Sequence, residues 1–385
     1  MNNTSRQAQN TTDESQESLE PDVARDPDAA WQYLEATELE SFGPMKVLQK
    51  ALIIRSVVIM NSSFATRSRS ATAGAGAPDY QNIGAGLQGI VYERMGCQFV
   101  CKKEQRRNPG RRLQDEFAMH RKVWDAFAKY NEFSGDLRVP KPYDFIPKDE
   151  LSRGELPRMP ADDRQPSDIA TMERILPLPK VVRKAMIKSF YPATNYSCDE
   201  HVVTQILNET ANKHCLARVY LGEKTVALSK ESFTLRNFPL TRDIMEVLDL
   251  DMVYFATMIG SAYAIMHWAA NITGDDVEFV LGTSASGPDD FQSREIHLYL
   301  LDFGQCETVN MDEDQDDIFQ ALKGSMVLRQ NQLYLPHPKR SARLYRAWKS
   351  AYLRTAHKII RSECLPFDPK EFCQAYEEYL EDFDP

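Results

Sequence analysis

The spacing of apolar and polar residues divides the chain into a strand-rich part and a helical part. From residue 79, the runs YQNIGAGLQGIVYER, CQFVCKK, RVPKPYDFIP and DIATMERILPLP have the alternation and the proline-limited lengths of β-strands. Between the second and the third run, LQDEFAMHRKVWDAF has apolar residues at helical spacing. After residue 176 the pattern is mainly helical, interrupted by the strand pair VEFVLG and IHLYLLD. This order predicts an α+β protein with a small β-rich N-terminal lobe, 79–176, and a larger helical C-terminal lobe, 177–385.

The residues before 79 have a different character. Residues 1–30 are polar and acidic, and such a composition cannot bury enough apolar surface to offset its ordering entropy, so we expect a disordered tail. Residues 31–78 are expected to form a helical extension and a linker. Trp31–Glu40 and Met45–Met60 have helical patterns, and the remainder is rich in Gly, Ala and Ser.

Composition narrows the class of protein. The net charge of −10 argues against a nucleic-acid partner. The seven cysteines are an odd number without a Cys-x-x-Cys pair or zinc-finger spacing, and the N-terminus lacks a secretory signal, so we expect reduced thiols in an intracellular protein, cytoplasmic or nuclear. Met252–Ala270 has no Asp, Glu, Lys or Arg, but its Thr, Ser, Tyr and His residues favour a buried helix over a membrane span.

A glycine-rich motif opens the predicted N-terminal lobe. IGAGLQGIV places Gly84, Gly86 and Gly89 in the pattern G-x-G-x-x-G, followed by Val91. Glycines suit a backbone that lies close over phosphate groups, because a Cβ would clash there. The same pattern occurs in dinucleotide-binding folds, where it opens a helix; here a β-type run follows, which favours a phosphate-covering hairpin.

The next strands carry the other candidates for nucleotide binding. FVCKK offers Lys102 to the phosphates, with Lys103 as its rival on the opposite face of the strand. Glu116 on the following helix is placed to pair with the lysine, and its neighbour Asp115 is the alternative. TMERI supplies a strand end whose backbone could contact an adenine edge; Met172 and Glu173 would border that pocket, although a Met in a strand is more often plain core.

Carboxylates follow the buried helix and the last strand pair. YLLDFGQC ends a strand at Asp302, the type of residue that holds Mg²⁺ in an Asp-Phe-Gly motif. In the segment ITGDDVEFVL, Asp275 or Asp276 is the candidate catalytic base. Glu278 is a candidate metal ligand, in place of the Asn that kinases have. The alternative for the two aspartates is a polar turn into the strand pair.

In this order the motifs resemble those of the protein-kinase-like superfamily, including small-molecule kinases of the aminoglycoside and choline type. More closely, MHWAANITGDDVEFVLG with LDFGQC is similar to a fungal family of uncharacterised domains labelled zinc finger protein. The resemblance covers about residues 79–340. It implies a two-lobed kinase-like fold with unassigned activity. The chain departs from kinases in lacking His-Arg-Asp, the metal-binding Asn and Ala-Pro-Glu.

Two functions follow from these residues. The first is a divergent small-molecule-type phosphotransferase that uses Mg-ATP and acts on an unknown small molecule or protein. The second is a catalytically inactive, pseudokinase-like module that binds nucleotide or a partner. A third, weaker reading is a scaffold without a ligand.

Overall fold

The computed structural model describes residues 30–60, 80–94, 97–105, 112–151, 156–192, 199–287 and 292–382. The expected disordered tail, the linker after residue 60 and Cys198 lie outside the described residues. Within them the chain is mixed α+β, as the pattern of apolar residues predicts.

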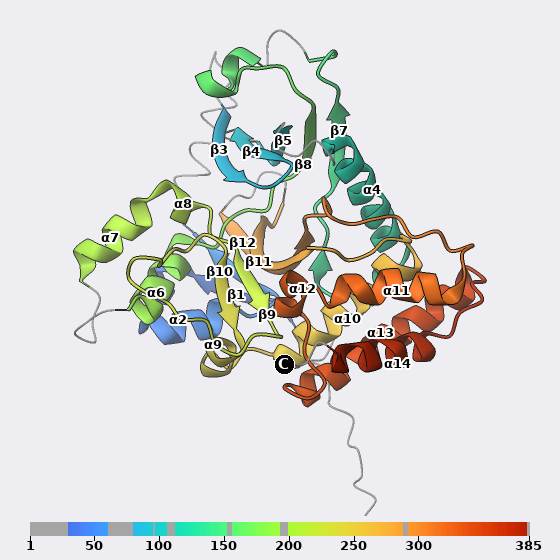
Figure 1. Cartoon of the computed structure of the whole chain (residues 1–385). Coiled ribbons are helices and arrows are strands. Elements are labelled where there is room, and N and C mark those ends of the chain that lie inside the picture. Colours follow the sequence, from blue (N-terminus) through green and yellow to red (C-terminus); the bar gives the residue numbers. More distant parts are fainter. Residues whose placement is uncertain are drawn as a thin grey trace, which may run out of the picture.

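The smaller of two sheets is formed by the strand-rich part of the sequence. It is antiparallel, has five strands and runs in the order β3-β4-β5-β8-β7. Helix α4, Leu113–Lys129, packs against β7 and β8 (Figure 1). The helix spans the residues that the apolar spacing predicts. The strands are β3 (Tyr80–Ala85), β4 (Gly89–Arg94), β5 (Phe99–Glu104), β7 (Pro142–Ile146) and β8 (Ile169–Glu173).

The larger sheet has seven strands and mixed direction. Its path is β1-β2-β12-β11-β9-β10, with β6 paired to β12. The predicted strand pair is confirmed as the antiparallel β11 and β12 at its centre, in which Glu278 lies opposite Leu301. The strands are β1 (Gln32–Glu35), β2 (Ser56–Ile59), β6 (Leu137–Arg138), β9 (Ala217–Tyr220), β10 (Phe238–Thr241), β11 (Glu278–Ala285) and β12 (Ser293–Leu301).

Helices cover the larger sheet on two sides (Figure 1). Among them α2 and α6 pack together, as do α10 and α13. The remaining described helices are α1 (Ala36–Leu39), α2 (Pro44–Ala51), α5 (Asn131–Ser134), α6 (Lys180–Phe190), α7 (Glu200–Asn208), α8 (Thr210–Lys213), α9 (Arg242–Val247), α10 (Met252–Trp268), α11 (Gln315–Met326), α12 (Arg329–Tyr334), α13 (Ala342–Ser362) and α14 (Pro369–Glu381), with 3₁₀ turns at Leu156–Arg158 and Ala161–Asp163.

Residues 31–60 differ from the helical extension that their pattern predicts. They contain the helices α1 and α2, but also the strands β1 and β2, which join the larger sheet through pairing of β2 with β12. The β-branched run Val57–Ile59 favours a strand, and its burial comes from a strand more than two hundred positions later in the sequence. A local helical period cannot reveal such a distant partner.

The interior of the larger part is built around α10. Its residues are buried almost all round, which explains the uncharged stretch in the sequence, and they belong to one continuous apolar core. The smaller sheet has two separate clusters, one of them between the sheet and α4. Among the described residues, no helix combines the length and apolar character that a membrane crossing requires.

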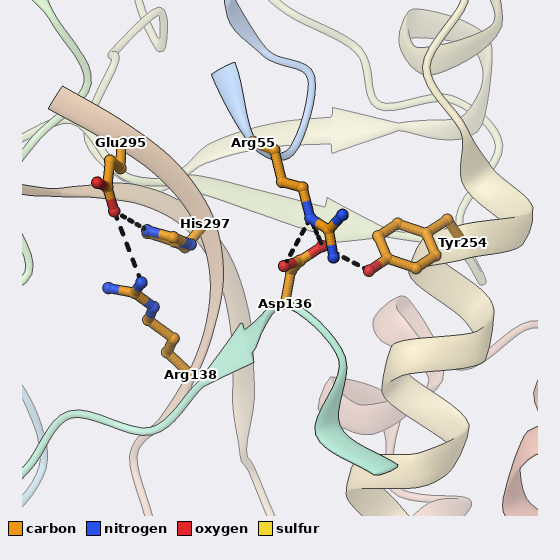
Figure 2. A network of polar contacts seen from close by, with 6 residues as sticks. All are labelled: Arg55, Asp136, Arg138, Tyr254, Glu295 and His297. Atoms are coloured by element: carbon orange, nitrogen blue, oxygen red, sulfur yellow. Dashed lines mark hydrogen bonds and ion pairs between the residues drawn. The ribbon is translucent and has the colours of Figure 1, made fainter. Parts of the chain in front are cut away.

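A partly buried polar network beside β12 ties three distant segments together (Figure 2). The Asp136 carboxylate accepts hydrogen bonds from Arg55 Nε at 2.8 Å and from Tyr254 Oη at 2.6 Å. Arg55 precedes β2 and Tyr254 lies on α10, so one carboxylate fixes the N-terminal segment to the central helix. Beside it, Glu295 contacts His297 Nε2 at 3.2 Å and Arg138 at 3.6 Å.

Candidate functional site

A buried lysine lies between two carboxylates where the sheets face each other. Lys102 Nζ on β5 is 2.5 Å from Glu116 Oε1 on α4 and 3.9 Å from Asp302 Oδ1 after β12. Burial alone would lower the pKa of Lys102, but the two carboxylates outweigh it and raise the pKa, so the ammonium stays charged. Residues from β5, α4 and the end of β12 therefore meet around one positive charge.

Strand alternation and helix phase decide between the rival residues at this contact. In the register of the small sheet, Lys102 lies opposite Val91 and Ala170, whereas Lys103 lies opposite Ile90 and Ile169 on the other face. Asp115 is exposed and caps the start of α4 with Arg112. Lys102 and Glu116, not their neighbours, form the pair.

The glycine-rich motif forms the turn of a hairpin between β3 and β4, so the run that the pattern predicts as one strand is two strands. The amide of Gly86 donates to the Gly89 carbonyl at 2.8 Å, which closes the turn. A Cβ on Gly89 would lie 2.4 Å from the Lys103 carbonyl oxygen, so only glycine permits this approach to β5. Gly84 lies near Arg236, and Val91 shares the face of Lys102.

Gln88 links this turn to the Asp-Phe-Gly segment, and the sequence analysis missed it. Its side chain is only 3% exposed, and its Nε2 donates to the Gly304 carbonyl at 2.8 Å. A Cβ on Gly304 would lie 2.5 Å from the Gln88 Oε1. The tip of the glycine-rich turn is thus held against the residues that follow β12. A polar residue between two glycines gives no signal of this contact in the sequence.

Four carboxylates lie at the ends of β11 and β12. Asp302 directly follows β12 with a φ of +67°, and the register of the pair brings it beside Glu278. Asp276, with a φ of +55°, has its pKa raised by burial and by Asp302. Asp275 points elsewhere, because its Oδ2 accepts a hydrogen bond from the Thr273 hydroxyl. The structure therefore groups Asp276, Glu278 and Asp302.

Glu278 has the most perturbed carboxyl of the group. Burial, opposed by Arg218 and reinforced by Asp302 and Asp276, raises its pKa to about 7. Arg218 on β9 forms an ion pair with it. No local pattern in the sequence predicts this guanidinium, because β9 reaches β11 only through the fold of the larger sheet.

Met172 and Glu173 lie at the end of β8, where the chain leaves the smaller sheet. Met172 pairs with Val100 and packs near Phe117 rather than lying exposed. The amide of Glu173 donates to the Lys141 carbonyl at 2.8 Å, and the amide of Arg174 donates to the Gln98 carbonyl at 2.9 Å. These two amides are engaged within the protein, so an adenine edge would have to be bound through other groups of this segment.

Comparisons with known proteins reach only part of the chain. The chain is an α+β protein in which a buried lysine and several carboxylates meet between two sheets. Residues 298–364, from β12 through α13, match the model of a family described as "Zinc finger protein". No curated protein matches the chain.

The zinc description has no counterpart in the described geometry. Within residues 30–382, outside the gaps named above, no group of three or more His, Cys, Asp or Glu side chains is arranged to hold a metal ion. His214 and Cys215 are neighbours, but burial raises the pKa of the Cys215 thiol to about 12. Such a thiol resists the deprotonation that zinc binding needs.

Proposed function

We propose that this chain has a protein-kinase-like two-lobed fold and binds Mg-ATP between its two sheets. The observation that carries the proposal is the Lys102 ammonium held between Glu116 and Asp302, on the sheet face behind the glycine-rich turn. Five antiparallel strands with one helix also support it, because they match the small lobe that the sequence resemblance implies. The larger part differs from the helical lobe expected, because its helices cover a second sheet of seven strands.

The residues of the site suit a magnesium-bound triphosphate. Carboxylate oxygens are the ligands that Mg²⁺ prefers, and Asp302 and Glu278 supply them. Burial and, to a lesser degree, the charge of Asp302 raise the pKa of Glu278, and a cation would relieve the repulsion between the two carboxylates. Two protein carboxylates are enough, because Mg²⁺ usually completes its shell with water and substrate phosphates. When bound, the ion would neutralise charge on the transferring phosphoryl group.

The residues of the proposed site have separate roles. Lys102 contacts phosphate oxygens and is positioned by Glu116. The glycine-rich turn offers backbone amides from above. Asp276 is the better of the two candidate bases, because it lies near Asp302, whereas Asp275 is bonded to Thr273. The acceptor is a small molecule or a protein.

A catalytically inactive binding module is the second candidate. It is favoured by the ion pair of Glu278 with Arg218, which places a positive charge against the proposed metal ligand. It is also favoured by the hydrogen bond of Gln88 to Gly304, which holds the glycine-rich turn in place and would limit its closure over a transferring phosphate. Both features suit binding without turnover.

Thermal unfolding with and without Mg-ATP tests nucleotide binding. A ligand at one hundred times its dissociation constant adds about 2.7 kcal/mol of stability, which shifts the midpoint measurably. We expect a magnesium-dependent shift that is lost in Lys102→Ala and Asp302→Ala but kept in the control Lys103→Ala. No shift at millimolar nucleotide would contradict the proposal.

Turnover is tested separately, by ADP release from the same protein. Phosphotransferase activity that falls in Asp276→Asn and persists in Asp275→Asn would support the enzyme. Binding without ADP release, with a panel of hydroxyl acceptors, would support the inactive module.

A further inference from the structure

A large cavity lies away from Lys102, where the exit from the smaller sheet meets the N-terminal segment and α6. Its volume is about 780 Å³, within the range of small-molecule sites. Its wall includes Gln81 and Glu93 of the small sheet, Thr37 of α1 and the residues that begin α6. Neither Lys102 nor the carboxylates of the proposed magnesium site line it.

The wall of this cavity is basic, although the chain as a whole has a net charge of −10. Positive side chains outnumber negative ones two to one. The cations are Arg174, Lys180, Arg183, Lys184, Lys213 and Arg294, and the acids are Glu35, Glu40 and Glu93. Two of the cations already have acidic partners, because Arg174 pairs with Glu93 and Lys184 pairs with Glu200, which lies outside the wall. This concentration of positive charge is therefore a local feature of the fold.

The buried cations of the wall repel one another. Arg174 and Arg294 are 7% and 4% exposed. Burial and the charge of Arg294 lower the pKa of Arg174 to about 10. His214, also in the wall, has its pKa lowered to about 4 by burial and by the surrounding positive charges, first among them Arg174 and Arg183. A negative ligand in the cavity would relieve this repulsion.

Helix α6 adds to the positive electrostatic potential of the cavity. Its first turn lines the cavity, its N-cap is Pro179, which supplies no side-chain hydrogen bond, and its first turn contains no acidic residue. The N-terminus of a helix carries a partial positive charge and favours anions. The usual acidic or hydroxyl residues that would satisfy it are missing from this turn.

We propose that this cavity binds a small organic molecule bearing two or more phosphate groups. Guanidinium groups match phosphate oxygens in geometry, and Arg174, Arg183 and Arg294 all contribute to the wall. More than one phosphate is needed to balance the excess of cations. The site is separate from the proposed nucleotide site and does not depend on it.

Calorimetric titration with pyrophosphate, without magnesium, tests the proposal. Lys180 and Lys213 are exposed, so Lys180→Gln/Lys213→Gln should fold normally. We expect the affinity of this double variant for pyrophosphate to be about tenfold lower or more, which is the effect of losing a charge-assisted hydrogen bond. The control Lys46→Gln/Lys224→Gln makes the same charge change at exposed positions outside the cavity and should bind as the wild type does.

Three results would overturn the proposal. One is no binding of pyrophosphate at millimolar concentration. Another is an equal loss in the control pair, which would show a general charge effect. The third is loss of binding in Lys102→Ala, which would place the anion at the proposed nucleotide site instead. Retention of Mg-ATP binding in Lys180→Gln/Lys213→Gln would show that the two sites fail independently.

Discussion

The buried pair of Lys102 and Glu116 offers the sharpest test of the site, because it separates stability from ligand binding. Both side chains are only 9% exposed, and their charged atoms are 2.5 Å apart. Removing one partner of a buried ion pair leaves an uncompensated charge and costs about 3–5 kcal/mol. Removing either partner should lower the free energy of unfolding, but by different amounts.

Glu116→Leu should cost about 3 kcal/mol, at the lower end of that range, because Asp302 remains 3.9 Å from the ammonium. Lys102→Met should cost about 2–3 kcal/mol, because the carboxyl left behind can take up a proton; burial already raises the pKa of Glu116. The double variant Lys102→Met/Glu116→Leu contains no buried charge at these positions. We expect its stability to lie within about 1 kcal/mol of the wild type.

Urea unfolding at neutral pH measures the four stabilities, and the cycle should give a coupling of about 4 kcal/mol or more. Single variants that each cost less than about 1 kcal/mol, or a double variant as unstable as the sum of the singles, would refute this reasoning. The double variant has a second use. If it is as stable as the wild type yet shows no stabilisation by Mg-ATP, the ion pair serves ligand binding rather than folding.

Three further outcomes follow from contacts described above. Gln88→Ala removes the hydrogen bond that holds the glycine-rich turn against the residues after β12, so the turn can adjust to a triphosphate and Mg-ATP affinity should rise by about two- to tenfold in a nucleotide titration. An unchanged or weaker affinity would contradict this restraining role of the side chain. Glu278→Gln should change the pH dependence of stability. Because the pKa of Glu278 is raised to about 7, the folded carboxyl takes up a proton between pH 7 and 5.5 while the unfolded one does not, so the wild type should gain about 1.5 kcal/mol over that interval relative to the variant in urea unfolding. Equal pH slopes of wild type and variant would show that the carboxyl titrates normally. Asp136→Asn weakens two hydrogen bonds to a guanidinium and a phenol and should lower the free energy of unfolding by about 2 kcal/mol, whereas a loss below about 0.5 kcal/mol would show that the network in Figure 2 is not stabilising.

Local patterns in the sequence were sufficient for much of the fold. The α4 helix and the β11–β12 pair follow from short-range periodicity, and both are present where the pattern predicts them. The sequence narrows the ion pair to Lys102 or Lys103 with Glu116 or Asp115, and the strand register and helix phase of the fold select Lys102 and Glu116. The assignment of roles to these residues stays a prediction.

The remainder depends on partners that are distant in the sequence. The strands β1 and β2 were interpreted as helical, because their pairing with β12 has no local signature. Arg218 reaches Glu278 only because β9 lies beside β11. Gln88 depends on a loop conformation that its own residue type does not specify. In each case the physical cause is tertiary context overriding or supplementing local preference.

The pairing of β2 with β12 has a consequence for how the chain acquires its structure. During synthesis, β2 and the apolar side of α2 emerge early, yet the strand that covers β2 is Ser293–Leu301, near the end. The whole smaller sheet is made in between. Contacts of such long sequence separation form slowly, because the intervening chain must first be ordered. The larger sheet is therefore expected to complete its folding only after β12 has left the ribosome. Until then β2 and α2 are expected to be clients for chaperones.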